Sequence, residues 1–223
     1  MHRSPYRVRD VMTRRVVAVR KGARYKEIVE TLHEWKVSAV PVLAEGDVVI
    51  GVVSEADLLP KEEFRDSDEP LGLDQLRRPL DLAKAAGSTA EQVMSSPAVT
   101  VGVDATLAQA ARIMAHTFVK RLPVVDAEGR LQGLVSRCDL LKVFLRSDAE
   151  LAREIDREVV EHLFRGTGAE VHARVEGGVV TLGGHLHDAS LVPVAARLAR
   201  AVEGVVDVEW ELDTEVTSAS RVP

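Results

Sequence analysis

The sequence of 223 residues has little cysteine and few aromatic side chains. Its one cysteine, Cys138, excludes an internal disulfide and any metal site built from several cysteines. Aromatic residues make up 4% of the chain, so its cores must be built from valine, leucine, alanine and isoleucine. The same scarcity disfavours a protein that stacks the bases of single-stranded nucleic acid on aromatic rings.

Long apolar runs are also missing. No stretch approaches the roughly 18 consecutive apolar residues of a membrane-spanning helix, and residues 1–6 lack the apolar core of a signal peptide. The formal net charge is −6, which argues against a polyanion as partner because such affinity depends on lysine and arginine. We therefore expect a cytoplasmic protein that does not bind nucleic acid.

The sequence does contain an internal repeat. Gly51–Leu59 and Gly133–Leu141 share one pattern at an offset of 82 residues, a short apolar strand that leads through a serine into a helix. The same offset relates Val11–Thr13 to Val93–Ser95 without a gap. Two long copies indicate a tandem domain, since a solenoid needs at least three short repeats.

Each copy is predicted to be an α/β unit. In the first copy we expect strands over 16–19, 39–43 and 48–53 and a helix over 24–34; in the second, strands over 99–101, 122–125 and 131–135 and helices over 107–116 and 137–146. Pro41 inside a strand indicates an edge or a position that donates no hydrogen bond.

Residues 61–88 have no counterpart in the minimal repeat. Within them, 73–86 has a helix-forming composition that Pro79 interrupts. We interpret the segment as a tolerated surface insertion, and the alternative is a segment ordered by a ligand or partner.

Ser54 with Asp57, and Ser136 with Asp139, allow two interpretations. A serine at a helix start with an acidic residue three positions later is a capping-box pattern, which predicts only local stabilisation. A helix start also attracts phosphate, and a carboxylate can accept hydrogen bonds from ribose hydroxyls. The spacing alone favours the cap.

The repeated elements together (Val-Met-Thr or Val-Met-Ser, a Pro-Val strand, then glycine, two apolar residues and Ser-x-x-Asp) resemble a tandem pair of CBS domains. The resemblance implies a pseudo-symmetric module whose clefts bind adenosine nucleotides or related adenosyl ligands. It implies that Asp57 and Asp139 hold the ribose, and that Ser54 and Ser136 approach the phosphates. It also implies a homodimer, for which the helix over 107–116 offers a face.

The two sites are expected to differ. Arg137 follows the serine of the second copy, where the first copy has Glu55. We expect one cleft to combine Arg137 with Lys120 and Arg121 and to prefer a highly charged phosphate tail, while the other is weak, empty or takes a less charged ligand. Thr100 is a further candidate for a polar contact in the first of these clefts.

The last part of the chain is predicted to have the order α-β-β-α-β, a small α+β sandwich with its helices on one face of a three-stranded sheet. A helix over 148–163 would be capped by Asp148, and Gly177-Gly178 predicts a hairpin turn. The strand 171–175, the stretch Gly-Val-Val-Thr-Leu-x-Gly and the later Val-x-Gly-Val resemble a BON domain. BON domains are associated with phospholipid or protein binding and bring no catalytic residues.

The predicted domains are a first CBS domain (7–60), an insertion (61–88), a second CBS domain (89–146) and a BON domain (149–213). We expect a regulatory sensor, not an enzyme, that binds AMP, ADP or ATP as a regulatory ligand, needs no catalytic cofactor, and relays binding through the BON domain. The alternative is a ligand-independent scaffold whose BON domain binds phospholipid or a protein partner. The sequence has no P-loop or nucleophile elbow. Its histidines 162, 172, 185 and 187 do not predict a converging metal site.

Overall fold

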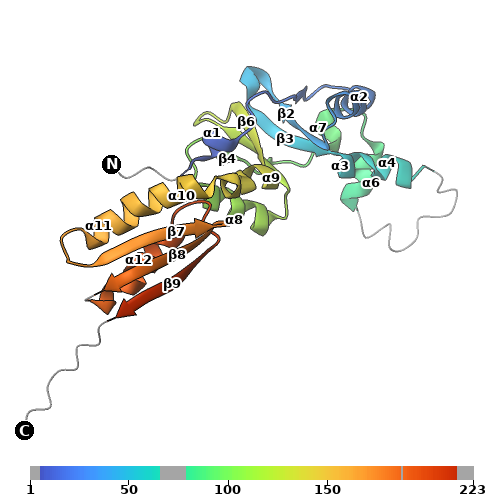
Figure 1. The fold of residues 1–223 in the computed structure, drawn as a ribbon. Coiled ribbons are helices and arrows are strands. Elements are labelled where there is room, and N and C mark those ends of the chain that lie inside the picture. Colours follow the sequence, from blue (N-terminus) through green and yellow to red (C-terminus); the bar gives the residue numbers. More distant parts are fainter. Residues whose placement is uncertain (1–5, 66–78, 187, 215–223) are drawn as a thin grey trace, which may run out of the picture. The chain divides into compact units, whose positions relative to one another are not determined.

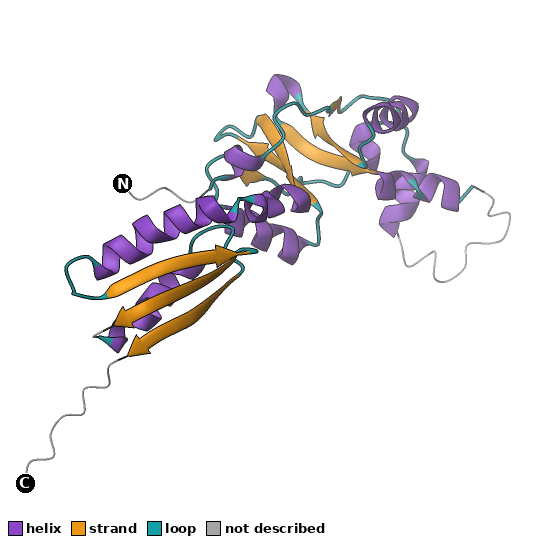
Figure 2. Ribbon diagram, viewed as in Figure 1, coloured by secondary structure: helices purple, strands orange, loops and turns teal. Residues whose placement is uncertain are grey.

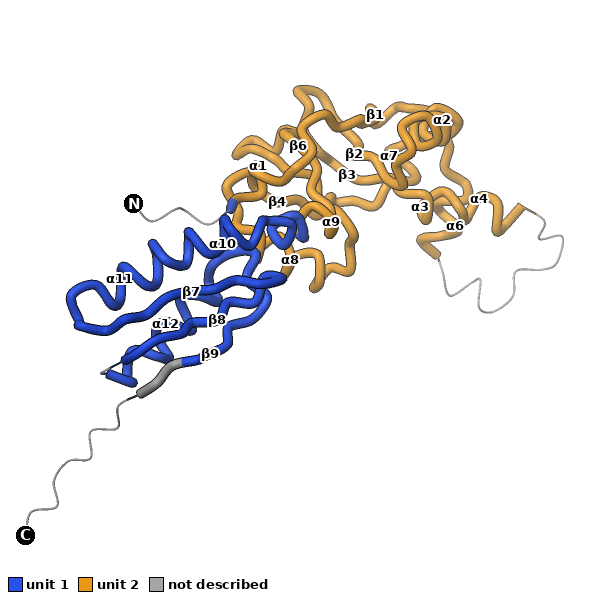
Figure 3. Tube along the Cα trace, in the orientation of Figure 1, with its two compact units in different colours: residues 1–6, 141–223 blue, residues 7–140 orange. Residues whose placement is uncertain are grey.

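The computed structural model describes residues 6–65, 79–186 and 188–214 (Figure 1). The chain divides into two compact units, which Figure 3 draws in different colours. The N-terminal unit comprises residues 7–140, and the C-terminal unit comprises residues 141–214 together with Tyr6. Each unit is described by itself.

The N-terminal unit contains two copies of one α/β arrangement. The first copy runs α1 (Val8–Val11), β1 (Val19–Arg20), α2 (Tyr25–Trp35), β2 (Ala39–Leu43), the 3-10 turn η1 (Glu45–Asp47), β3 (Val49–Ser54), α3 (Glu55–Leu58), α4 (Pro60–Glu63) and α6 (Pro79–Ala86). The second runs α7 (Ala90–Val93), β4 (Val101–Gly102), α8 (Leu107–Thr117), β5 (Arg121–Val125), β6 (Leu131–Ser136) and α9 (Arg137–Leu140). In each sheet the middle strand is parallel to the first and antiparallel to the third.

The strand registers show that the two copies are equivalent. Val42 lies opposite Gly51 in the first sheet, and Val124 lies opposite Gly133 in the second. In both sheets the register shifts at the following residue. These positions differ by 82, so the structure confirms the repeat.

The two copies interlock through the segments that open each repeat. Thr13 forms an antiparallel bridge with Leu134, and Ser95 forms the equivalent bridge with Val52. A Cβ atom at Gly133 would lie 2.6 Å from the methionine sulfur of the other copy's Val-Met-Thr segment. The glycine of the repeated pattern is therefore needed for this close approach between the copies.

Some element limits differ from the prediction. The strand expected over 16–19 is reduced to β1, which pairs only with Val42 and Leu43 of β2. Pro41 therefore lies in the middle strand of its sheet, but before the part that β1 covers. Pro79 is the first described residue of α6, and proline is tolerated in the first turn of a helix, where its missing N–H has no helical partner. Residues 66–78 of the expected insertion, which include those before Pro79 on which the expected interruption depends, lie outside the described residues.

The C-terminal unit has the predicted order of helices and strands. It runs η2 (Leu141–Leu145), α10 (Asp148–Ile155), the π-helical turn η3 (Asp156–Val160), α11 (Glu161–Phe164), β7 (Glu170–Glu176), β8 (Val179–Leu186), η4 (Ala189–Leu191), α12 (Val192–Arg200) and β9 (Asp207–Thr214). β8 is the middle strand, antiparallel to β7 and parallel to β9. The helix expected over 137–146 ends at Leu140 and is followed by the 3-10 segment η2.

The helices of this unit cover one face of its sheet (Figure 2). Leu151 and Ile155 of α10 and Ala199 of α12 share a core with Val180 and Leu182 of β8. The two β8 residues are two positions apart and therefore point to the same face.

Across the described ranges, no helix is both long enough and apolar enough to cross a lipid bilayer.

The cap of α10 differs from the prediction. Ser147, not Asp148, is the N-cap, and its side chain accepts a hydrogen bond from the Glu150 backbone N–H. The Asp148 carboxylate instead accepts the backbone N–H groups of Gly177 and Gly178 at 2.8 and 2.9 Å. Asp148 thus ties the β7–β8 turn to the start of α10, a contact across about 30 residues that sequence spacing could not indicate.

Candidate ligand-binding site

The two Ser-x-x-Asp motifs have the same local geometry. The Ser54 N–H and hydroxyl donate to Asp57 Oδ2 at 2.8 and 2.6 Å, and Ser136 donates to Asp139 Oδ2 at the same two distances. In α3 the capping box is complete. The capping role that the spacing favours is therefore present, and it uses one oxygen of each carboxylate.

Each motif also lines a cavity built from both copies. The Asp57 cavity has a volume of about 380 Å³, and the Asp139 cavity about 760 Å³. Both volumes are in the range of small-molecule sites. The Asp57 cavity is lined by Ser54, Glu55 and Asp57 of the first copy and by Ser95, Val99, Phe118, Lys120 and Arg121 of the second, among others. The Asp139 cavity is lined by Ser136, Asp139 and Arg121 of the second copy and by Thr13, Arg15, Trp35, Lys36 and Glu55 of the first, among others.

This exchange between copies corrects the predicted grouping of the cations. Lys120 lines the Asp57 cavity, not the cleft of Asp139 as the sequence was interpreted. Arg121 lines both cavities, and its guanidinium donates to the Ser38 hydroxyl at 2.8 Å. Arg137 lines neither cavity and donates to the Val119 carbonyl at 3.3 Å. The prediction placed residues of one copy in one cleft, whereas the interlocked segments bring each copy's motif to the other copy's strands.

The prediction also put Thr100 in the wrong cleft. It lines a separate, open depression beside α8, together with Gln109, Arg112 and Thr117. Its neighbour Val99 is the residue that lines the Asp57 cavity. The threonine therefore makes no contribution to the cleft in which it was expected.

Among the described residues, Asp57 is the one charged residue that counts as buried when the whole residue is considered, with 9% of its surface exposed. The Lys84 ammonium forms an ion pair with Asp57 Oδ1, and the Ser95 hydroxyl donates to the same oxygen at 2.9 Å. Lys84 also donates to the Ser95 hydroxyl at 3.0 Å. Burial alone raises the pKa of the Asp57 carboxyl, but hydrogen bonds from Lys84, Ser54 and Ser95 outweigh it and hold that pKa below its ordinary value.

The sequence analysis missed two residues that contact Asp57. Ser95 lines the Asp57 cavity, and Lys84 pairs with Asp57 without being part of the cavity lining. The repeat could have identified Ser95, because it relates Ser95 to Thr13, which lines the other cavity. Lys84 gave no signal, since it belongs to the segment interpreted as a tolerated surface insertion. The structure corrects that interpretation: α6 delivers a cation to the buried carboxylate of the repeat motif.

Replacing Lys84 with methionine is expected to change how stability depends on pH. A carboxyl whose pKa is lowered by folding adds stability above its unfolded pKa, and that stability is lost as the pH falls through the folded pKa. In the wild type, Asp57 should therefore contribute to the decrease in the free energy of unfolding as the pH falls below about 5. In Lys84→Met the pKa of Asp57 rises, so this contribution should shrink or reverse. Urea unfolding of both proteins between pH 3 and 7 measures how the free energy of unfolding depends on pH. The same pH dependence in both proteins would contradict the role of Lys84 in lowering the pKa of Asp57.

The histidines do not form a metal site in the part of the chain that the structure describes, where no group of three or more potential ligands converges. His187 lies outside the described residues. His172 lies on β7 opposite Gly183 of β8, and His185 lies opposite Glu170.

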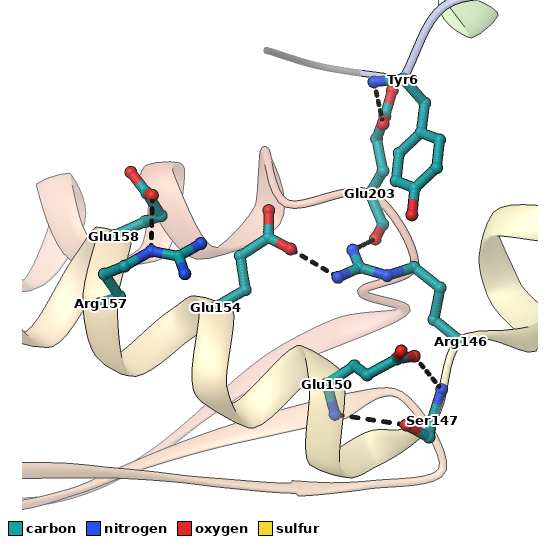
Figure 4. Close-up of polar contacts among 8 residues, drawn as sticks. All are labelled: Tyr6, Arg146, Ser147, Glu150, Glu154, Arg157, Glu158 and Glu203. Atoms are coloured by element: carbon teal, nitrogen blue, oxygen red, sulfur yellow. Dashed lines mark hydrogen bonds and ion pairs between the residues drawn. The ribbon is translucent and has the colours of Figure 1, made fainter. Parts of the chain in front are cut away.

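A second polar cluster lies in the C-terminal unit (Figure 4). The Arg146 guanidinium pairs with the Glu154 carboxylate and donates to the Glu203 carbonyl at 2.6 Å. The Glu203 carboxylate accepts the Tyr6 backbone N–H at 2.6 Å, and the Tyr6 ring centroid lies 5.7 Å from the guanidinium carbon. These groups satisfy one another, so the cluster connects chain segments and is not an open site.

The comparisons with known proteins agree with this architecture. A family model of the CBS domain matches residues 8–61 and 90–146, which identifies the chain as a CBS-domain protein. A model of the BON domain matches residues 147–215. The chain therefore carries two CBS segments followed by a C-terminal BON domain, as the sequence predicted.

Two relatives show the extent of the likeness. The uncharacterized protein MJ1426 of Methanocaldococcus jannaschii is 29% identical over 153 residues, covering 62% of this chain and 90% of that protein. The chloroplastic CBS domain-containing protein CBSX2 of Arabidopsis thaliana is 30% identical over 158 residues, covering 65% of this chain and 66% of that protein. The crystal structure of CBSX2 in complex with AMP matches with a TM-score of 0.55 and 30% identity, over 63% of this chain and 97% of that chain.

Proposed function

We propose that the N-terminal unit is a regulatory sensor that binds an adenosine nucleotide in the Asp57 and Asp139 cavities. The observation that carries the proposal is that each cavity combines a Ser-x-x-Asp motif of one copy with cationic side chains of the other. The similarity to CBSX2, which was solved with AMP, makes AMP the first ligand to test.

In this proposal the two carboxylates accept the ribose hydroxyls. Lys120 and Arg121 face the phosphates in the Asp57 cavity, where they supply charge-assisted hydrogen bonds. Ser54 and Ser136 contribute hydroxyls on the phosphate side. Arg137 and Thr100, which line neither cavity, are left out of the ligand set.

Thermal unfolding tests the sensor. AMP, ADP, ATP, NADH, S-adenosylmethionine and GTP are added separately at millimolar concentration, and at least one adenosyl ligand should raise the melting temperature. A ligand present at about 100 times its dissociation constant stabilises the fold by about 2.7 kcal/mol. The double variant Asp57→Asn with Asp139→Asn should lose this ligand-dependent rise.

The control separates ligand binding from capping. Thr106 caps α8 through a hydrogen bond from the Gln109 N–H at 3.2 Å and lines neither cavity. Thr106→Ala should cost about 1 kcal/mol of stability with or without nucleotide, and should keep the ligand-dependent rise. If no adenosyl ligand raises the melting temperature of the wild type, the sensor is wrong and the ligand-independent scaffold takes its place.

The BON domain is proposed to report the bound state to a protein partner. Its region, residues 147–213, contains 14 acidic and six basic side chains, and Glu170, Glu176, Glu209 and Glu211 are exposed on β7 and β9. This charge opposes docking on an anionic lipid surface. A relay also requires that the ligand bind one arrangement of the protein more tightly than another. The homodimer and the cytoplasmic location stay predictions from the sequence.

A further inference from the structure

The carboxylate that the proposed function assigns to the ribose already has a cationic partner. Lys84 pairs with Asp57 Oδ1, and the exposed fractions of the two side chains are 18% and 10%. Asp57 Oδ2 accepts both hydrogen bonds from Ser54, so it is engaged by the capping box. Asp57 Oδ1 accepts from both the Lys84 ammonium and the Ser95 hydroxyl. Two ribose hydroxyls that donate to Asp57 would therefore have to use the oxygen that these two groups hold.

The helix that carries Lys84 has separate anchors. The Lys61 ammonium donates to the Ala85 carbonyl at 2.6 Å, near the end of α6. The Tyr25 N–H donates to the Ser88 carbonyl at 2.9 Å, just beyond the helix. Because these contacts do not involve Asp57, the Lys84 side chain can leave the carboxylate while α6 stays attached.

Lysine suits such a displacement. Its ammonium is a compact, strongly hydrated charge on a flexible stem of four carbons, and it can regain water when it moves outward. The ion pair neutralises the buried Asp57 carboxylate, whose charge would otherwise be costly in this position. A ligand that replaces Lys84 must offer donors of its own to the same oxygen, as a pair of ribose hydroxyls does.

We propose that Lys84 is a built-in competitor of the ligand at the Asp57 cavity, and that it sets the affinity of this cavity. The inference rests on the proposed function and concerns this cavity alone. Binding of an adenosine nucleotide exchanges the Lys84 ammonium for ribose hydroxyls on Asp57 Oδ1. Helix α6 thereby takes part in ligand recognition, although the repeat does not include it.

The test isolates the Asp57 cavity by working in an Asp139→Asn background. AMP binding is measured by isothermal titration calorimetry with and without the additional change Lys84→Met. Methionine keeps the length and apolar stem of the side chain but cannot pair with the carboxylate. Lys84→Met should tighten AMP binding roughly tenfold, which corresponds to about 1.4 kcal/mol.

Two variants control the interpretation. Lys61→Met removes an anchor of α6 but leaves Lys84 on Asp57, and it should leave the AMP affinity unchanged. Adding Asp57→Asn to Lys84→Met should abolish the tightening, because the carboxylate is then gone.

The outcomes separate this inference from the proposed function. If AMP binds and Lys84→Met leaves the affinity unchanged, or weakens it because the ammonium contacts the ligand, Lys84 is not a competitor and the sensor still stands. If neither the wild type nor any of these variants binds an adenosyl ligand, both proposals are wrong. Melting temperatures measured without ligand show whether each variant is folded before it is titrated.

Discussion

Replacing Arg146 with methionine is expected to destabilise the C-terminal unit by about 3 kcal/mol, because it leaves a charge without its partner in a mostly buried setting. The exposed fraction is 8% for the Arg146 side chain and 14% for that of Glu154. The variant also removes the hydrogen bond from the guanidinium to the Glu203 carbonyl and the contact with the Tyr6 ring. The loss therefore affects three separate segments of the chain at once.

Tryptophan fluorescence can follow this unit selectively. The chain has two tryptophans, and Trp210 packs against the core of the C-terminal unit. Trp35 belongs to α2 of the N-terminal unit, so a Trp35→Phe background leaves Trp210 as the reporter. Urea unfolding in that background then gives the free energy of unfolding of this unit with and without Arg146→Met.

The matched control is an exposed ion pair on the same unit. Arg174 and Glu176 lie 2.9 Å apart with exposed fractions of 75% and 81%, so Arg174→Met should change stability by less than about 0.5 kcal/mol. Combining Arg146→Met with Glu154→Met should recover much of the loss, because replacing both members of a buried pair removes the uncompensated charge. Equal effects of Arg146→Met and Arg174→Met would contradict the structural role of the cluster.

The repeat and its consequences could be predicted from the sequence to a large extent. The offset of 82 residues is visible in short motifs. It predicts the same order of strands and helices in both copies, and the equivalent registers of the two sheets agree with it. The order of the C-terminal unit could be predicted because its strands alternate and glycines mark its turns. Both signals are local, and local signals survive in a single sequence.

The composition of the cavities could not be predicted, because it depends on contacts between distant segments. Lys120 follows α8 in the second copy, but it lines the cavity of a motif more than 60 residues away in the first. Lys84 contacts Asp57, although Lys84 lies in a segment whose composition resembles a surface insertion. Asp148 similarly looks like a helix cap until the turn at Gly177 is seen to approach it. In each case the partner is chosen by packing between elements, which spacing along the chain does not encode.

The glycines of the BON pattern have physical explanations that the structure supplies. Gly184, the last residue of Gly-Val-Val-Thr-Leu-x-Gly, has a φ of +125°. Gly204, in Val-x-Gly-Val, has a φ of +100°, and a Cβ atom there would lie 2.6 Å from the Val143 carbonyl oxygen. Glycine is required at both positions because the backbone has a positive φ and because another chain segment approaches closely.

Gly184→Ala is accordingly expected to destabilise the C-terminal unit by about 3 kcal/mol or more. The positive φ is strained for any residue with a side chain, at a cost of roughly 1 to 3 kcal/mol. The added Cβ would also overlap the Glu170 carbonyl oxygen, so β7 would have to move relative to β8, where Val171 lies opposite Gly184. Trp210 fluorescence in the Trp35→Phe background measures the result.

Gly177→Ala provides a reference for a positive φ without a close contact, because Gly177 has a φ of +58° and no atom within 4 Å of the position its Cβ would take. That variant should cost about 1 kcal/mol from the left-handed conformation alone. The excess cost of Gly184→Ala over Gly177→Ala then combines the close approach of β7 with the greater strain of a φ of +125° compared with +58°. If the two variants unfold at the same urea concentration, neither the close approach of β7 nor the φ of +125° at Gly184 adds to the cost of an ordinary left-handed position.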